Sequence, residues 1–131
     1  MKQIHVAGKR KRAIATATLD AGTGIVSVNR VPFGAQFAFL YQQKILEPII
    51  IAGETGRKVN VSVCVRGGGM NAQAEASRLA IGRALVQFDK KLERTFLDYD
   101  RQLLVADVRR KETRKPNTHG KARAMRQKSY R

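Results

Sequence analysis

An alternating strand, three glycines and a long amphipathic helix follow one another in residues 59–88, and this order limits the fold more than any other feature. In Val59–Arg66 the valines at every second position share one face, while polar residues share the other. After the glycines at 67–69, helical spacing predicts a helix over residues 71–88 with Asn71 as its N-cap. We therefore expect an α+β fold in which this helix covers one face of a sheet. The predicted buried stripe of the helix is Ala74, Ser77, Ile81, Ala84, Leu85 and Phe88, beside a row of small residues, Ala72, Ala76, Ala80 and Ala84.

Other segments give shorter signals. Residues 13–19 alternate, and residues 25–29 follow after the turn-rich sequence DAGTG, which predicts a β-hairpin. Helical spacing predicts a helix that opens at Pro32 and stops or restarts at Pro48, because proline lacks an N–H group. The remaining expectations are a loop at residues 53–57, a short helix at residues 90–97 and a last strand at residues 103–106.

The charge is concentrated at the two ends of the chain. The formal net charge is +16 over 131 residues. Residues 1–12 hold five bases and no acid, residues 13–106 hold eleven bases and eight acids, and residues 107–131 hold ten bases and two acids. Such uncompensated charge repels itself and calls for a polyanion. Nucleic acid is the leading partner, ahead of an anionic membrane surface, and the division predicts a globular body at 1–106 and an extended basic tail at 107–131.

Composition argues against a membrane protein, a disulfide-bonded protein, a metalloprotein and an enzyme. No run of about 18 apolar residues is present, so we expect no membrane span. A single cysteine, Cys64, rules out an internal disulfide and favours the cytoplasm. His5 and His119 lie in opposite basic segments, so neither a metal site nor another cofactor is expected. The carboxylate pair Asp98 and Asp100 favours a solvated face or a salt bridge over catalysis.

The glycines at 67–69 allow three interpretations. A nucleotide-binding loop would also lie between a strand and a helix, but the sequences GxxxxGK[ST] and GxGxxG are absent. Glycine also permits a positive φ or a close approach of the backbone. Alternatively, backbone N–H groups at the start of the helix could bind an RNA phosphate. The last two interpretations are compatible and both stay open.

Both basic ends are candidate RNA-binding segments. Four consecutive cations at residues 9–12 repel one another unless phosphates intervene, although a solvated charge run is the alternative. The tail has too few apolar side chains to order itself. The alternatives to RNA binding by the tail are a disordered solubilising extension or a nuclear localisation signal. The candidate RNA contacts are Lys9, Arg10, Lys11, Arg12, Arg66, Gly67, Gly68, Gly69, Arg109, Arg110, Lys111, Arg114, Lys115, Lys121, Arg123 and Arg126.

The segment GGGMNAQAEASRLAIGRAL, residues 67–85, resembles the signature of the family of the ninth protein of the small ribosomal subunit. Two further segments, KRKRAIATATL and GIVSVNRVPF, are also similar to this family, while YDRQLLVADVRRKE and the closing QKSYR resemble its archaeal and eukaryotic branch. The short N-terminus is more similar to archaeal than to eukaryotic members. Arg126 departs from the family, which usually has an aromatic residue at that place. The residues that carry the signature are Gly67, Gly68, Gly69, Gln73, Ala76, Ala80, Gly82, Arg83 and Ala84.

The resemblance implies a fold and a place of action. The fold would be a two-layer α/β sandwich like the second domain of ribosomal protein S5, with a left-handed βαβ crossover. The body would bind ribosomal RNA in the head of the small subunit, beside neighbouring head proteins. The tail would reach the anticodon stem-loop of the tRNA in the peptidyl (P) site, through Lys128, Ser129, Tyr130 and above all Arg131.

We therefore expect a structural RNA-binding protein of the ribosome that is not an enzyme and has no small-molecule substrate. Two hypotheses from other classes remain. A free-standing nucleic-acid-compacting protein would need only a long basic tail. An enzyme would use the loop at residues 67–69 to bind a nucleotide.

Overall fold

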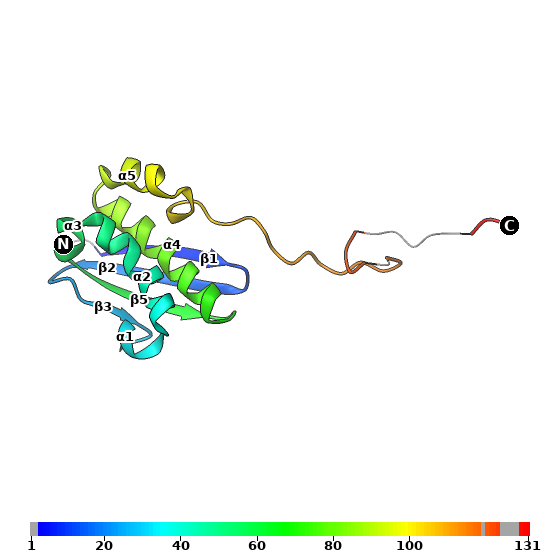
Figure 1. Ribbon diagram of the computed structural model, residues 1–131, viewed down its shortest axis with the longest axis horizontal. Coiled ribbons are helices and arrows are strands. Elements are labelled where there is room, and N and C mark those ends of the chain that lie inside the picture. Colours follow the sequence, from blue (N-terminus) through cyan, green and yellow to red (C-terminus); the bar gives the residue numbers. More distant parts are fainter. Residues whose placement is uncertain (1–2, 119, 124–128) are drawn as a thin grey trace.

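A five-stranded sheet and a layer of helices form the folded part of the chain (Figure 1). The computed structural model describes residues 3–118, 120–123 and 129–131. The strands in these residues are β1 (Ile4–Arg10), β2 (Ala13–Ala21), β3 (Val26–Val28), β4 (Val31–Pro32) and β5 (Val59–Arg66), in the sheet order β1-β2-β5-β3-β4. The helices are α1 (Phe33–Gln36), α2 (Phe39–Ala52), α3 (Glu54–Arg57), α4 (Met70–Phe88) and α5 (Leu92–Tyr99), followed by the 3-10 turn η1 (Arg101–Leu103).

The predicted strand and long helix are confirmed as β5 and α4. All four valines of β5 are buried, and α4 packs against β1, β2 and β5 while α2 packs on α4. The α+β class is thereby confirmed. Two details differ from the prediction. The N-cap of α4 is Gly69, and the Asn71 Oδ1 atom instead accepts a hydrogen bond of 2.8 Å from Lys44 Nζ. Phe88 is 44% exposed, because it ends the helix beyond the edge of the core.

The predicted hairpin of residues 13–19 with 25–29 is wrong. β2 pairs with β1 and β5, whereas β3 runs parallel to β5 on its other side. The connection crosses the end of β5 instead of turning back, and Asn60 holds it there. Its Oδ1 atom accepts hydrogen bonds from the backbone N–H groups of Thr23 and Ile25 at 2.9 and 3.0 Å. A local turn signal could not reveal that a later strand inserts between the two earlier ones.

The helical region after Pro32 also differs from the prediction. It splits into α1 and α2, and Pro48 lies inside α2, which continues to Ala52. Burial of Pro48 together with Ile45 and Ala52 offsets the hydrogen bond that the proline lacks. Residues 53–57, predicted as a loop, contain the short helix α3. The predicted strand at residues 103–106 is absent from the described residues, and η1 buries Leu103 instead. The predicted helix at residues 90–97 is confirmed as α5.

β1 lies unusually close to α4. A Cβ atom built on Gly8 would lie 2.4 Å from the Ala76 carbonyl oxygen and 2.7 Å from the Ala80 nitrogen. Ala76 and Ala80 are fully buried on the same side of the helix. Glycine on the strand and alanines on the helix therefore allow the two backbones to pack with almost no side chain between them.

The chain leaves the body after η1. Leu103 is the last buried apolar residue among those described. Figure 1 shows residues 108–118 running away from the sheet and helices in an extended path. These residues contain no helix or strand, and Val108 is 89% exposed.

Replacement of Gly8 by alanine should destabilise the fold. The added methyl group meets backbone atoms of α4, which cannot rotate away, so we expect unfolding to cost about 1–3 kcal/mol less. Urea unfolding followed by circular dichroism measures this. Gly34→Ala is the matched control, because nothing lies within 4 Å of that position. Equal midpoints for the two variants would contradict the close packing of β1 on α4.

Candidate nucleic-acid interface

The turn between β1 and β2 presents two of the predicted RNA-binding residues. The last strand pair is Arg10 with Ala13, so Lys11 and Arg12 form a two-residue turn, and both are exposed. Lys11 has a φ of 52°, a left-handed conformation that costs a residue with a side chain about 1–2 kcal/mol. The tight turn therefore holds two cations at the end of the hairpin at some expense in stability.

The three glycines lie beside this turn. Gly67 and Gly68 have φ values of 73° and 68°, and a Cβ atom on Gly67 would lie 2.7 Å from the Arg12 carbonyl oxygen. The structural interpretation is thus confirmed for these two glycines. Gly69 has open space around it and is the N-cap of α4 without a side-chain hydrogen bond. Arg66, at the end of β5, is exposed next to them.

The start of the tail meets the same turn. Residues 109–114 and the turn line a cleft of about 830 Å³. Six of its lining side chains are cations and one, Glu112, is an acid. Segments about a hundred residues apart in sequence are thereby brought together at one end of the body. We call the six cations Lys11, Arg12, Arg109, Arg110, Lys111 and Arg114 the cationic junction.

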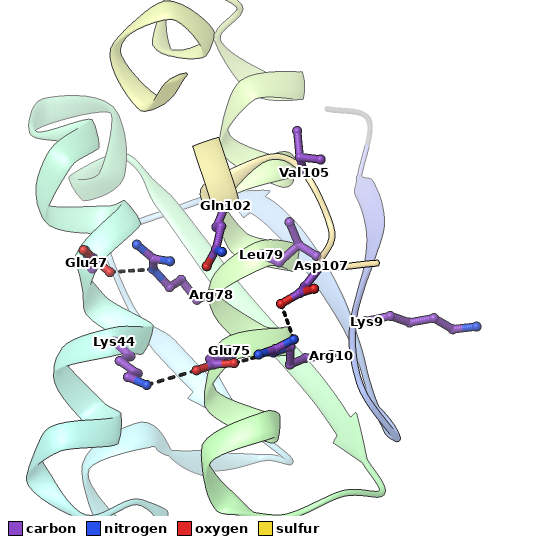
Figure 2. A pocket seen from close by; sticks show the side chains of 10 residues that line it. All are labelled: Lys9, Arg10, Lys44, Glu47, Glu75, Arg78, Leu79, Gln102, Val105 and Asp107. Atoms are coloured by element: carbon purple, nitrogen blue, oxygen red, sulfur yellow. Dashed lines mark hydrogen bonds and ion pairs between the residues drawn. The ribbon is translucent and has the colours of Figure 1, made fainter. Parts of the chain in front are cut away.

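Arg10 faces the other way and is bound by carboxylates. Its Nε atom donates to Glu75 Oε2 at 2.6 Å, and its Nη1 atom donates to Asp107 Oδ2 (Figure 2). The Arg10 side chain is only 17% exposed. It lines a second cleft, of about 360 Å³, from which the Lys9 side chain points away.

Asp107 links this cleft to the tail. It accepts hydrogen bonds of 2.8 Å from the backbone N–H group of Arg109 and from that residue's guanidinium, in addition to the bond from Arg10. The Arg109 side chain, above all, holds the pKa of the Asp107 carboxyl well below its usual range. Burial opposes ionisation of Glu75, but hydrogen bonds from Arg10 and Lys44 outweigh it and lower the pKa of Glu75. Both carboxylates therefore stay ionised at neutral and mildly acidic pH.

A second arginine holds the chain just before Asp107. Arg83 Nε donates to the Leu104 carbonyl oxygen at 2.8 Å, and its Nη1 atom donates to the Ala7 carbonyl oxygen at 3.1 Å. Arg83, Arg10 and Asp107 thus fasten the start of the tail to α4 and β1, and we call these three residues the tail latch. Sequence reasoning placed Arg83 in the family signature and Arg10 among phosphate contacts. It missed Asp107, although an acid at the start of a basic tail is a usable signal.

The remaining predicted residues lie along the tail. Lys115 N donates to the Lys121 carbonyl oxygen at 3.0 Å, and Arg123 Nε lies 2.6 Å from Glu112 Oε2. Ser129, Tyr130 and Arg131 are exposed, Tyr130 at 88%. Arg126 and Lys128 lie outside the described residues.

Two polar groups outside the basic segments, Asp100 and His5, have structural partners. Asp100 accepts a hydrogen bond of 2.8 Å from Arg78, so its salt-bridge interpretation is confirmed, and His5 Nδ1 lies 3.0 Å from the Thr18 hydroxyl. Over residues 3–118, 120–123 and 129–131, the structure has no cluster of His, Cys, Asp or Glu that could hold a metal. Every helix in that part of the chain is too short or too polar to cross a bilayer.

Comparison with known proteins gives the family. Residues 8–131 match the family described as ribosomal protein S9/S16. The chain belongs to the ribosomal protein S9/S16 family. It is 45% identical over 134 residues to the small ribosomal subunit protein uS9 of Methanococcus maripaludis strain C7, with both chains covered completely. The uS9 proteins of Thermoplasma volcanium and Thermoplasma acidophilum are 44% and 46% identical, the first over the full length of both chains and the second over 95% of this chain and 97% of its own.

Membership of the S9/S16 family confirms the predicted resemblance and its archaeal character. It also confirms that the chain is not an enzyme, because this is a family of structural ribosomal proteins. The hypothesis of a nucleotide-using enzyme is therefore dropped. The cationic junction and the tail latch therefore belong to a protein with a structural role in the small ribosomal subunit.

The tail latch predicts that removing the negative charge of Asp107 weakens RNA binding. Asp107→Asn removes a negative charge beside the cationic junction, so charge alone would strengthen RNA binding. We expect instead that small-subunit ribosomal RNA is bound about tenfold more weakly, because freeing even one backbone residue adds about 1–2 kcal/mol of ordering cost. Filter binding at fixed salt measures the affinity.

Glu112→Gln is the matched control for this prediction. It also removes one negative charge next to the cationic junction, but Glu112 pairs only with tail residues, Lys115 and Arg123, among those described. We expect it to bind RNA equally well or slightly more tightly. Tighter binding by both variants would show that Asp107 has no positioning role.

Proposed function

We propose that this protein is a structural constituent of the small ribosomal subunit, in the cytoplasm, that binds small-subunit ribosomal RNA in the head. The observation that supports this most directly is the cationic junction, which gathers two basic segments from opposite ends of the sequence. Phosphate groups are the ligands that such a cluster needs, since arginine binds phosphate through two parallel hydrogen bonds and lysine as a point charge. The names of the full-length relatives agree with this assignment.

The body and the tail contribute different contacts. On the body, Lys9, Lys11, Arg12 and Arg66 are exposed around one end of the sheet. Beside them, the uncapped start of α4 after residues 67–69 offers backbone N–H groups to a phosphate. Arg10 contributes indirectly, because its guanidinium is bound to Glu75 and Asp107. Along the tail, the proposed contacts are Arg109, Arg110, Lys111, Arg114, Lys115, Lys121, Arg123 and Arg126.

The tip of the tail is proposed to contact the anticodon stem-loop of the tRNA in the P site. Ser129, Tyr130 and Arg131 are exposed, which supports such a contact. Lys128 adds a further cation in the sequence. Contacts of this kind fix the position of a nucleic acid through its phosphates without identifying its bases. They would stabilise the bound tRNA and help to hold the reading frame.

The finer fold assignment belongs to the same proposal. β3 and β5 are parallel neighbours joined through α1, α2 and α3, which is the connection that a βαβ crossover requires. We assign this two-layer sandwich to the type of the second domain of ribosomal protein S5, with a left-handed crossover. The division into a body at residues 1–106 and a tail at residues 107–131 is supported by the burial of Leu103 and the exposure of Val108. Neighbouring head proteins would contact the body.

A chain that ends after Asp107 tests the role of the tail. We expect it to unfold cooperatively, because the buried apolar residues precede the cut, and to bind ribosomal RNA weakly. If five tail cations neutralise phosphates, the log–log slope of affinity against salt should be less steep by about 4. Titrations at several salt concentrations measure the slope. An unchanged slope would refute the proposed tail contacts, and loss of cooperative unfolding would refute the division into body and tail.

Removal of Arg131 tests the tip separately. We expect P-site tRNA to bind at least about tenfold more weakly to reconstituted subunits, because one charge-assisted phosphate contact contributes about 1.5–3 kcal/mol. Assembly of the subunit should be unchanged, since the body and the cationic junction are intact. Toe-printing and sedimentation report the two quantities. Normal tRNA binding combined with defective assembly would contradict the proposed division of roles.

A further inference from the structure

In the part of the chain that the structure describes, the helices lie over one face of β1, β2 and β5 and leave the other face open. The buried residues of β2 and β5 alternate with exposed ones, and the helices pack on the buried side. On the opposite side, β1, β2 and β5 present mostly short or cationic side chains. We call Lys9, Ile14, Thr16, Ser62, Cys64 and Arg66, all exposed, the open sheet face.

The strand register arranges this face in rows. Lys9 pairs with Ile14 and Ile14 with Arg66, so two cations flank one row. The next row pairs Thr16 with Cys64, and Ser62 lies one row further along β5. Neighbouring strands are about 4.8 Å apart and alternate residues about 7 Å apart, which leaves a low surface of hydroxyl and thiol groups. The cationic row is the one nearest to the β1–β2 turn and therefore to the cationic junction.

The chemistry of the open sheet face favours RNA over protein. The side chains of Thr16 and Ser62 are exposed, and so their hydroxyls can bond an external group. Protein interfaces are centred on buried aromatic and large apolar anchors. On the open sheet face Ile14 is 46% exposed, whereas on the helix side Leu40 and Ile50 of α2 are 73% and 65% exposed. The two cations match a polyanion. His5 shares this side of the sheet, but its Nδ1 atom lies 3.0 Å from the Thr18 hydroxyl, and β1, β2 and β5 contain no Phe, Tyr or Trp ring on which a single-stranded base could stack.

We propose that the open sheet face lies against the minor groove of a ribosomal RNA double helix. The minor groove of A-form RNA is wide and shallow and displays ribose 2′-hydroxyl groups. A low surface can enter it, Thr16 and Ser62 can bond those hydroxyls, and Lys9 and Arg66 can meet the phosphates at its edge. This inference rests on the proposed function and names the feature of the RNA that the body binds. The cationic junction would then continue along the backbone of the same double helix.

Cys64 reports directly on this face. It is the only cysteine in the chain, and it is exposed beside Thr16 and two residues from Arg66. We expect its alkylation by a maleimide to slow at least about tenfold when the full chain binds a protein-free transcript of small-subunit ribosomal RNA, because the thiolate must be accessible to react. The matched control is the double variant Cys64→Ser, Gln43→Cys, which carries its thiol on the exposed side of α2. Its rate should be the same with and without RNA.

The outcomes separate the inference from the proposed function. Binding is measured independently by filter retention, so failure of the transcript to bind would count against the proposed function itself. Binding without protection of Cys64 would overturn the inference alone. Protection that appears only in assembled subunits, and not with the naked transcript, would also overturn it, because a neighbouring protein would then be the partner.

A variant series provides a second measurement. Thr16→Phe and Ser62→Phe place bulky rings on the open sheet face, and phenylalanine is well tolerated in strands. We expect each to weaken binding to the transcript about tenfold while Gln43→Phe, on α2, has no effect; such a loss corresponds to about 1.4 kcal/mol. Circular dichroism confirms that each variant is folded. Equal affinities for the three folded variants would overturn the inference.

Discussion

The close packing of β1 on α4 is the constraint on which the other features depend. Gly8 lets the strand approach the backbone of α4 at Ala76 and Ala80, where a single methyl group would not fit. This approach brings Arg10, two residues further along β1, within 2.6 Å of Glu75 on α4. Arg10 can then hold Asp107, and Arg83 of the same helix can hold Leu104 and Ala7. The packing of Gly8 on Ala76 and Ala80 thus determines where the tail begins and which way the β1–β2 turn faces.

Four acids of this cationic protein orient arginines of the body. Glu75 and Asp107 bind Arg10, while Glu47 and Asp100 bind Arg78 between α2 and η1. These arginines stabilise the body and are partly withdrawn from solvent. The cations of the cationic junction are those left at the surface, close enough to repel one another. Arg109 is paired with Asp107 and Glu112 lines the same cleft, so the protein relieves only part of this repulsion and a bound polyanion would relieve the rest.

The sequence predicted what depends on local periodicity. The alternation of Val59–Arg66 and the spacing of α4 place β5 and α4 correctly, because one face of each element is buried in a single core. The strand order could not be predicted from local patterns, because β5, which comes later in the sequence, inserts between β2 and β3. β1 was missed because its basic end resembles a solvated segment. Lys11 and Arg12 were recognised from charge alone, but the inward orientation of Arg10 depends on Glu75 and Asp107, which only the fold brings near.

An anchored start changes what the tail can do. A chain with few apolar side chains loses conformational entropy at every residue that the RNA orders, and this loss opposes each phosphate contact. Residues next to the tail latch are already restricted, so their contacts retain more of their electrostatic free energy. Those near Arg131 are remote from the latch in sequence, so under the proposed function their order would come from the bound RNA and tRNA. The latch also fixes the point from which the tail departs, which raises the effective concentration of the tip near a site at the matching distance. A short ion-pair network on the body can therefore influence a contact made at the far end of the chain.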